Sequence, residues 1–193
     1  MKICFASNNQ NKYIEIQNLL GASISVQTLE EIGCKEDLPE TQPSIEGNAN
    51  QKAHYVYQKF GIPCFADDTG LEVDALDGEP GVYSARYAGP QRSSTDNMTL
   101  LLQKLAGKAN RNAQFKTVIT YIDQNGRHSF TGIVKGKITD KPKGMEGFGY
   151  DPIFIPEGSS KTFGEMKLEE KNLFSHRAKA TAQLVSFLKE RFK

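Results

Sequence analysis

Two adjacent carboxylates, Asp67 and Asp68, are the residues best suited to chemistry in this sequence. They follow the apolar stretch 63–66 and precede Thr69 and Gly70. If 63–66 is a buried strand, its C-terminal end delivers the carboxylates to the edge where open α/β sheets bind ligands. Successive strand residues point to opposite faces, so only one of the pair should face a given cleft. Asp68 is the candidate to hold a divalent cation and accept a proton from an attacking water. The alternative is a simple turn, because Asp, Thr and Gly are common turn residues.

A strand, a polar loop and a helix at the N-terminus would position a phosphate. Residues 2–6 are almost continuously apolar, which predicts a buried parallel strand, and 12–20 carry apolar residues at helical spacing. This arrangement offers backbone N–H groups and a positive dipole end to an anion. Lys12 opposes the dipole, so a neighbouring anion explains it better. The alternative, compatible with the first, is that Asn9 or Asn11 caps the helix. The loop has no Walker-type glycine pattern.

The remaining elements follow from spacing and stop signals. The strongest is the Asn125-Gly126 turn of a hairpin. We expect the first helix to end at Gly21, and further helices over 45–60 after Ser44 and over 95–106 after Ser94. A short helical segment should cover 165–172, and a final helix should begin after Ser175 and bury Phe192. The expected strands are 23–29 and 153–155, the hairpin 113–123 with 127–138, and a hairpin or extended arm from 71–76 and 82–87.

Two more polar groups could recognise a ligand. The glycine- and aromatic-rich loop 144–152 suits stacking on a nucleobase, and the alternative is a tight turn with its aromatics in the core. His176 and Arg177 open the final helix, with Lys171 a few residues earlier. Positive groups at a positive helix end predict a pocket for an electronegative group, although a structural histidine or a surface arginine is the usual explanation for either residue alone.

Length and composition restrict the class of protein. The 193 residues predict a single domain, 1–193, that can bury a core without disulfide or metal staples. A net charge of +1 argues against general attraction to nucleic acid or anionic membrane. Three widely separated cysteines predict buried or free thiols in a reducing compartment. With no signal peptide and no long apolar span, we expect a cytoplasmic protein without membrane or nucleic-acid partners.

These segments occur in an order that resembles a known family. The matching residues are Ser7-Asn8-Asn9-Gln10-Asn11-Lys12 with Glu15, Glu40-Thr41, Asn48-Ala49 with Lys52, Ala66-Asp67-Asp68-Thr69-Gly70-Leu71, the run 80–87, Gly147-Phe148-Gly149-Tyr150-Asp151-Pro152, and Lys171 with Ser175-His176-Arg177. Together they resemble the inosine triphosphate pyrophosphatase family, the Ham1-like nucleoside triphosphate pyrophosphatases. Gln42-Pro43 departs from the glycine that the family commonly has, and Tyr150 stands where some relatives carry tryptophan.

The resemblance implies a fold and an activity. The fold would be α/β, with a mixed elongated β-sheet flanked by helices and two lobes with a central cleft (Maf/Ham1-like). The protein would be a magnesium-dependent homodimer. It would hydrolyse ITP, dITP and XTP to the monophosphate and pyrophosphate, which removes damaged purines from the nucleotide pool.

The resemblance also assigns roles to residues. Glu40 and Asp68 would bind Mg²⁺, and Asp68 would accept the proton while Asp67 supports it. Donors of His176 and Arg177 would pair with the 6-oxo group of hypoxanthine or xanthine, whereas adenine presents an amino group there. Phe148 would stack on the base. The other substrate contacts would come from Ser7, Asn8, Asn9, Gln10, Asn11, Lys12, Thr69, Gly149, Tyr150, Asp151 and Lys171, with Lys52 a weaker candidate.

Two other functions are compatible with parts of the pattern. A Maf-type pyrophosphatase would act on pyrimidine nucleotides, but the Ser-His-Arg helix start and the Phe-Gly-Tyr-Asp loop favour purines. A non-catalytic nucleotide- or RNA-binding module would bind without releasing pyrophosphate. The pairing of Glu40 with Asp68 and the near-neutral charge argue against that module.

Overall fold

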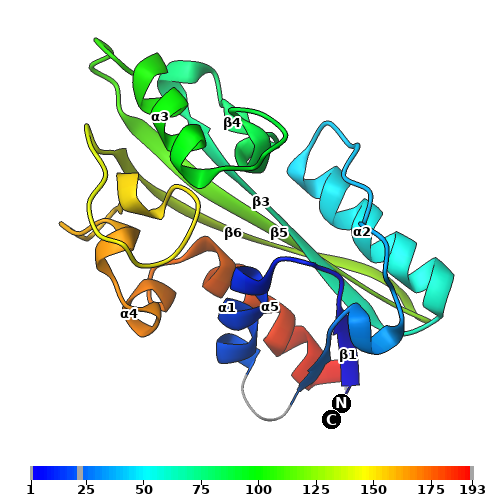
Figure 1. Cartoon of the computed structure of the whole chain (residues 1–193). Helices are drawn as coiled ribbons and strands as arrows, with labels where there is room; N and C mark the ends of the chain where they lie inside the picture. Colours follow the sequence, from blue (N-terminus) through cyan, green and yellow to red (C-terminus); the bar gives the residue numbers. More distant parts are fainter. Residues whose placement is uncertain (1, 21–23, 192–193) are drawn as a thin grey trace. The chain divides into compact units, whose positions relative to one another are not determined.

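A computed structural model describes residues 2–20 and 24–191 of the chain (Figure 1). Its strands are β1 Lys2–Phe5, β2 Ser25–Gln27, β3 Cys64–Val73, β4 Pro80–Gly81, β5 Asn112–Asp123, β6 Gly126–Ile138 and β7 Phe154–Pro156. Its α-helices are α1 Gln10–Leu20, α2 Ile45–Phe60, α3 Ser94–Lys104, α4 Leu168–Asn172 and α5 His176–Arg191. The strands form one mixed sheet in the order β2-β1-β3-β5-β6-β7, with β4 paired to β3. The predicted mixed α/β fold with a helix-flanked sheet is confirmed.

The chain divides into two compact units that share its long strands. The first unit comprises the described parts of Met1–Asp68, Thr117–Gly132 and Arg177–Lys193. The second comprises Thr69–Lys116 and Ile133–His176. Strands β3, β5 and β6 therefore each contribute residues to both units. That 1–193 is one domain stays a prediction.

In the first unit, β1 runs parallel to both of its neighbours, as its apolar sequence predicts. Alternate residues of β1 and β3 enter two separate clusters. Phe5 and Phe65, whose rings stack at 4.9 Å between centroids, pack with residues of α1 and α5. Cys4 and Cys64 lie in the other cluster, with residues of α2. The helices α1 and α5 thus cover one face of β3 and α2 covers the other (Figure 1).

The second unit is built around an apolar cluster with several aromatic rings. Leu71 of β3, Phe115 of β5 and Ile138 of β6 are buried there, together with Leu101 and Leu105 from α3 and its end. β4 pairs antiparallel with β3, and β7 pairs antiparallel with β6. Tyr150, Phe163 and Met166, from the segments that follow β6, belong to the same cluster.

The strongest local signals in the sequence are confirmed. Helix α2 spans 45–60 as predicted, and the Ser44 side chain caps it by accepting a hydrogen bond from the Gly47 backbone N–H. The Asn125-Gly126 hairpin also forms, joining β5 to β6. Gly21, residue 23 and Phe192, to which we assigned a helix end, a strand start and a buried position, lie outside the described residues.

Other predicted boundaries are wrong, and the largest error concerns β3. The strand does not end at Ala66 but continues to Val73, so residues 67–70 are extended and form no turn. Their carboxylates have cationic partners on both faces of the strand, and polar side chains with partners do not require the chain to leave the sheet. The site therefore lies within a strand rather than at its end.

Two smaller corrections have equally local causes. The predicted hairpin forms, but β3 pairs with Pro80–Gly81 (β4) and not with 82–87, because Ser84–Arg86 forms a 3₁₀ turn. The Ser84 hydroxyl fixes that turn by accepting from the Leu71 N–H at 2.9 Å and donating to the Gly81 carbonyl at 2.6 Å. Ser93 rather than Ser94 caps α3, accepting a hydrogen bond from the Asp96 N–H.

Over the described part of the chain, no helix has the length and apolar character that crossing a membrane would require.

Candidate active site

Asp67 and Asp68 lie on opposite faces of β3, as their adjacent positions in a strand predict. Phe65 belongs to the cluster that α1 and α5 cover, and Asp67, two residues later, faces the same way. Ala66 belongs to the cluster that α2 covers, and Asp68 faces that side. Each carboxylate therefore meets side chains from different helices.

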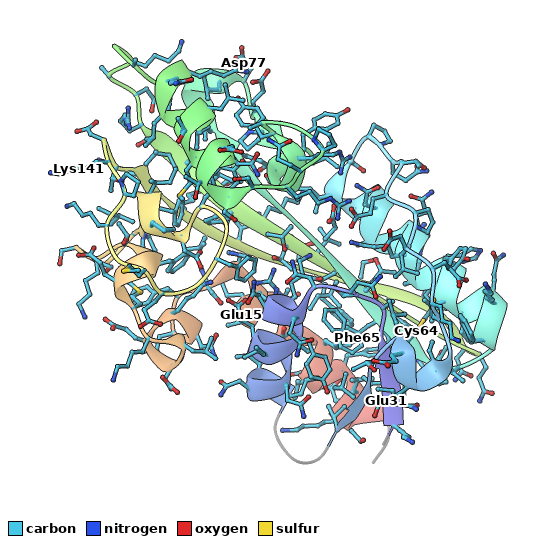
Figure 2. The ribbon with its side chains drawn as sticks, viewed as in Figure 1. Glu15, Glu31, Cys64, Phe65, Asp77 and Lys141 are labelled. Atoms are coloured by element: carbon cyan, nitrogen blue, oxygen red, sulfur yellow. The ribbon has the colours of Figure 1, made fainter. Side chains whose placement is uncertain are left out.

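Asp67 lies in a buried network of four charges. Its Oδ1 is 3.0 Å from Lys12 Nζ of α1, and its Oδ2 accepts a hydrogen bond from Arg177 Nε of α5 at 3.1 Å. The same guanidinium also pairs with Glu15, which projects from α1 (Figure 2). Arg177 is 1 % exposed and Asp67 is fully buried. The balanced charges and the burial of Asp67, Arg177 and Glu15 indicate that this group fastens α1, β3 and α5 together.

The surroundings of Asp67 keep it ionised. Burial by itself would raise the pKa of this carboxyl, but the charges of Lys12, Arg177 and Lys52 outweigh burial and hold the pKa well below its usual range. Burial in turn lowers the pKa of Lys12, an effect that the Asp67 carboxylate opposes. A carboxylate this strongly held by cations is a weak proton acceptor.

Asp68 faces a polar group on α2. Asn48 and Lys52 lie one turn apart on the buried side of that helix, and both are at least 96 % buried. Lys52 Nζ is 3.4 Å from Asp68 Oδ1, and Asn48 Nδ2 donates to Asp68 Oδ2 at 3.4 Å. Lys52 Nζ also lies 2.6 Å from Glu40 Oε1. One ammonium group therefore joins the two carboxylates predicted to bind metal.

The pKa of Asp68 moves in the opposite direction to that of Asp67. Burial raises it, and Glu40 and Asp67 raise it further, while Lys52 and Lys12 lower it without cancelling the rise. The pKa of Lys52 is lowered by burial, but the Asp68 and Glu40 carboxylates outweigh burial and raise it. Neighbouring carboxyls whose pKa values are pushed apart mark a division between a proton acceptor and a fixed charge. The raised pKa makes Asp68 the better proton acceptor of the two carboxylates.

The loop that carries Glu40 is fastened to α2, and this fixes its path past Gln42-Pro43. The Gln42 backbone N–H donates to Asn48 Oδ1 at 2.9 Å. Thr41 exchanges two hydrogen bonds with the side chain of Gln51, at 2.9 Å and 2.8 Å. The helix that supplies Lys52 thus also holds the segment that supplies Glu40.

Glu40 and Asp68 are suitable ligands for Mg²⁺ even though they are only two. Among residues 2–20 and 24–191, no group of three or more His, Cys, Asp or Glu side chains is arranged to hold a metal ion. Mg²⁺ generally keeps several waters and binds through one or two carboxylates plus the phosphates of a substrate. The donor set fits an ion of that kind.

The N-terminal loop presents polar side chains to solvent. Asn9 caps α1, since its Oδ1 accepts from the Lys12 N–H at 3.2 Å, which confirms one of the two predicted explanations. The anion near Lys12 is Asp67, within the protein. Ser7 is half-buried and accepts from the Asn9 N–H at 3.2 Å, and Asn8, Gln10 and Asn11 are exposed. These exposed amides surround backbone N–H groups at a helix start, a suitable place for phosphate oxygens.

In the second unit, a buried ion pair supports the glycine-rich loop. Lys171 Nζ lies 2.6 Å from Asp151 Oδ2, and both side chains are about 96 % buried or more. The same carboxylate accepts from the Phe148 N–H at 2.8 Å. Lys171 Nζ also lies 5.1 Å from the centroid of the Phe148 ring, within the range of a cation–π contact. Asp151 and Lys171 therefore hold Phe148 from its backbone and from its ring.

The two aromatic residues of this loop differ in burial. The predicted alternative, a turn with its aromatics in the core, therefore applies to Tyr150 and not to Phe148. Phe148 is half-buried, whereas Tyr150 lies in the core, and its hydroxyl donates to the Ser84 carbonyl at 2.9 Å. Gly147 has φ +72°, and a Cβ at this position would overlap Asp151 Oδ2. Gly149 also has a positive φ, and a Cβ there would meet nothing within 4 Å.

The last predicted site residues differ in their surroundings. His176 is 3 % exposed and stacks on Phe115, with ring centroids 4.7 Å apart. Thr69 is half-buried and follows Asp68 along β3. The structure brings Arg177 to the Glu15 and Asp67 carboxylates. Contacts of these residues, and of Tyr150, with a substrate stay predictions.

Comparison with known proteins identifies the family. The model of the Ham1 family matches residues 3–187. The chain belongs to the Ham1 family. It is 59 % identical to a dITP/XTP pyrophosphatase of Flavobacterium johnsoniae, with 97 % of this chain and 98 % of that protein covered. It is 50 % identical to a dITP/XTP pyrophosphatase of Porphyromonas gingivalis, with 97 % of each covered.

Solved structures of Ham1 proteins have the same fold. The Staphylococcus aureus Ham1 protein superposes with a TM-score of 0.91 at 38 % identity, covering 99 % of this chain and 100 % of that one. A HAM1 protein from Coxiella burnetii gives a TM-score of 0.90 at 36 % identity, covering 98 % of this chain and 99 % of that one.

Sequence reasoning underrated two residues of this Ham1-family chain. Lys52 was the weaker candidate for a substrate contact, yet it joins Glu40 to Asp68. Glu15 was assigned no role, yet it pairs with Arg177. A signal for Lys52 was present in the sequence, because Asn48 and Lys52 adjoin the apolar positions on the inner side of α2, where polar residues require partners. For Glu15, the signal in the sequence was its place in the family pattern, shortly after the run 7–12.

Proposed function

We propose that this Ham1-family protein hydrolyses the non-standard purine nucleoside triphosphates ITP, dITP and XTP to the monophosphate and pyrophosphate. The single observation that carries the proposal is the division of Asp67 from Asp68. One buried carboxylate is fixed by cations, and its neighbour has a raised pKa and lies beside a second carboxylate. The names of the Flavobacterium and Porphyromonas relatives support the substrate class.

In the proposed reaction, Asp68 is the general base. A water attacks the α-phosphorus in line with the leaving pyrophosphate, and an Asp68 carboxylate oxygen takes its proton. The raised pKa of Asp68 suits proton transfer near neutral pH better than an ordinary aspartate does. Asn48 and Lys52 hold the carboxylate in one orientation. Phosphoryl transfer depends mainly on this kind of positioning and on charge stabilisation.

Glu40 and Asp68 would hold Mg²⁺. The ion would supply neutralisation of phosphate charge and polarisation of the phosphoryl oxygen when bound. Lys52 would add a positive charge toward the triphosphate. The exposed amides and backbone N–H groups of the loop before α1 would bind phosphate oxygens, as helix starts commonly do.

Phe148, His176 and Arg177 would recognise the base. Phe148 would stack on the purine, with its position set by Asp151 and Lys171. Donors from His176 and Arg177 would pair with the 6-oxo group of hypoxanthine or xanthine, which leaves adenine mismatched. Such a mismatch can cost several orders of magnitude in selectivity. Guanine shares the 6-oxo group, so its exclusion would occur at the 2-position.

Assembly as a homodimer and a location in the cytoplasm belong to the same proposal. Three buried free thiols are compatible with a reducing compartment. Sedimentation of the purified chain measures the assembly, and a monomer at micromolar concentration would contradict the dimer.

A panel of nucleoside triphosphates tests the activity. Pyrophosphate release is measured with Mg²⁺ for ITP, dITP, XTP, GTP, ATP and dTTP. We expect the first three to be turned over fastest, and Asp68→Asn to lower release from all of them by about 10²–10⁴-fold. Preferential hydrolysis of dTTP would point to a Maf-type enzyme, and binding without release would point to a non-catalytic module.

A further inference from the structure

Lys52 occupies the position between the two carboxylates proposed to bind the metal. Its ammonium lies 2.6 Å from Glu40 Oε1 and 3.4 Å from Asp68 Oδ1. The side chain is 5 % exposed, and it arises from the middle of α2, which also holds Asp68 through Asn48. An ammonium in this position satisfies the charge of oxygen atoms that a cation would otherwise bind.

A divalent cation that arrives alone meets this ammonium at close range. The cation would compete with Lys52 for the same oxygens. It would also be repelled by the positive charge of Lys52, which water and salt screen poorly because the side chain is buried. Glu40 and Asp68 together carry two negative charges, and Lys52 already balances one of them. The pair therefore offers a free cation much less attraction than two unpaired carboxylates would.

A cation that arrives on a triphosphate meets a different balance. The phosphate oxygens bring several negative charges, and they can take over the Lys52 ammonium while the carboxylates turn to the metal ion. Lysine suits this exchange because its ammonium is a compact charge on a flexible stem. The Lys52 ammonium moves from the carboxylates to the phosphate oxygens, so it has an anionic partner before and after the exchange.

We propose that Lys52 is an internal counter-ion that makes metal binding depend on the polyphosphate. The free protein binds divalent cations weakly, and it retains them once a polyphosphate is present. This inference rests on the proposed metal site and adds to it a binding order. Lys52 is a positioning residue in this role, because it controls when Glu40 and Asp68 become metal ligands.

Equilibrium dialysis with Mn²⁺ tests the proposal without any turnover. Wild type is compared with Lys52→Met, which removes the charge and keeps the stem, and with Lys52→Arg, which keeps the charge. Lys59→Met is the matched control, since Lys59 lies on the same helix but is exposed and paired with Glu36. We expect Lys52→Met to bind Mn²⁺ about tenfold or more tightly than wild type. The other two variants should match wild type.

A second variant identifies where the extra Mn²⁺ binds. Adding Glu40→Gln to Lys52→Met should abolish the gain, because one of the two carboxylates is lost. A gain that persists would place the cation elsewhere and overturn the proposal. Equal Mn²⁺ affinity of wild type and Lys52→Met would also overturn it.

Inorganic pyrophosphate provides a test on wild type alone, which does not require a variant to fold. Adding it at a fixed free Mn²⁺ concentration should raise Mn²⁺ retained by wild type about tenfold or more. Retention that is already high without pyrophosphate would overturn the proposal. Failure of the proposed function is distinguished by the nucleotide panel, which measures pyrophosphate release by wild type and does not depend on the Mn²⁺ results.

Discussion

Asp67 and Asp68 are consecutive residues of β3, yet their carboxylates bind different cations on opposite faces of the strand. Lys12 and Arg177 hold Asp67, and Lys52 holds Asp68 together with Glu40. The period of two along a strand is sufficient to give two adjacent carboxylates different cationic partners and opposite pKa shifts. No loop between them is needed for this separation.

The two aspartates should respond differently to the same substitution. Asp67→Asn leaves buried Arg177 short of a partner, and we expect a loss of about 3–5 kcal/mol in the free energy of unfolding. Asp68→Asn should lower turnover of ITP by about 10²–10⁴-fold, the usual worth of a general base. Urea unfolding and pyrophosphate release measure the two effects. A stable Asp67→Asn protein, or an Asp68→Asn protein with near-normal turnover, would contradict the assignment.

The stability changes of these variants should also depend on pH with opposite signs. The pKa of Asp67 is lowered in the folded protein, so its contribution to stability is present above the unfolded value of 3.8 and is lost as the pH falls below it. The cost of Asp67→Asn should therefore shrink below about pH 4. The pKa of Asp68 is raised, so its favourable contribution is present below 3.8 and is lost as the pH rises through the folded pKa. The stability of Asp68→Asn relative to wild type should rise over that range. Urea unfolding from pH 3 to 7 measures both, and parallel curves would count against the opposed pKa shifts.

The cysteines should be unreactive in the folded protein. Burial raises the pKa of Cys4 and of Cys64 from 9.0 to about 12. At pH 8 the thiolate fraction should therefore be about a thousandfold lower than for an ordinary cysteine. Burial also raises the pKa of Cys34. We expect almost no reaction with a disulfide reagent at pH 8 until urea unfolds the chain, when all three thiols react. Rapid labelling of native protein would show that the thiols are exposed.

The Lys171–Asp151 pair should matter far more than an exposed ion pair nearby. Lys171→Met leaves the Asp151 carboxylate buried without its ammonium, which should cost about 3–5 kcal/mol of stability. The loss of the cation–π contact should also loosen Phe148 and raise KM for ITP. Lys161→Met is the matched control, since its pair with Glu170 is exposed and worth about 0–1 kcal/mol. Equal effects of the two substitutions on unfolding would refute the role given to Lys171.

Gly147 should tolerate no side chain. Gly147→Ala forces a Cβ onto Asp151 Oδ2 at a backbone φ of +72°, and we expect a loss of more than about 2 kcal/mol together with a higher KM. Gly107→Ala is the control for the cost of placing alanine at a positive φ, since Gly107 has φ +74° and a Cβ there would meet nothing within 4 Å. That control should lose only about 1–2 kcal/mol. If both variants unfold at the same urea concentration, the contact with Asp151 has no importance.

Local signals predicted much of the fold but could not reveal the partners of the buried charges. Ser44, the apolar period of α2 and the Asn125-Gly126 turn each act over a few residues, so their elements lie where the sequence predicts them. The pattern Asp67-Asp68-Thr69-Gly70 suggested a turn instead of a strand. The cations that satisfy these carboxylates come from positions 12, 52 and 177, and no local pattern shows that they meet.

The use of α5 to complete the first unit has a consequence for synthesis on the ribosome. Glu15 and Asp67 are made before Arg177, which pairs with both, because Arg177 lies in α5 and follows Asp67 by 110 residues. Until α5 leaves the exit tunnel, these carboxylates have no guanidinium and the apolar residues of β1 and α1 lack part of their cover. These carboxylates must therefore stay hydrated, or be held by a chaperone, until α5 has been made. A stop codon shortly before α5 would remove the residue on which the earliest-made part of the protein depends.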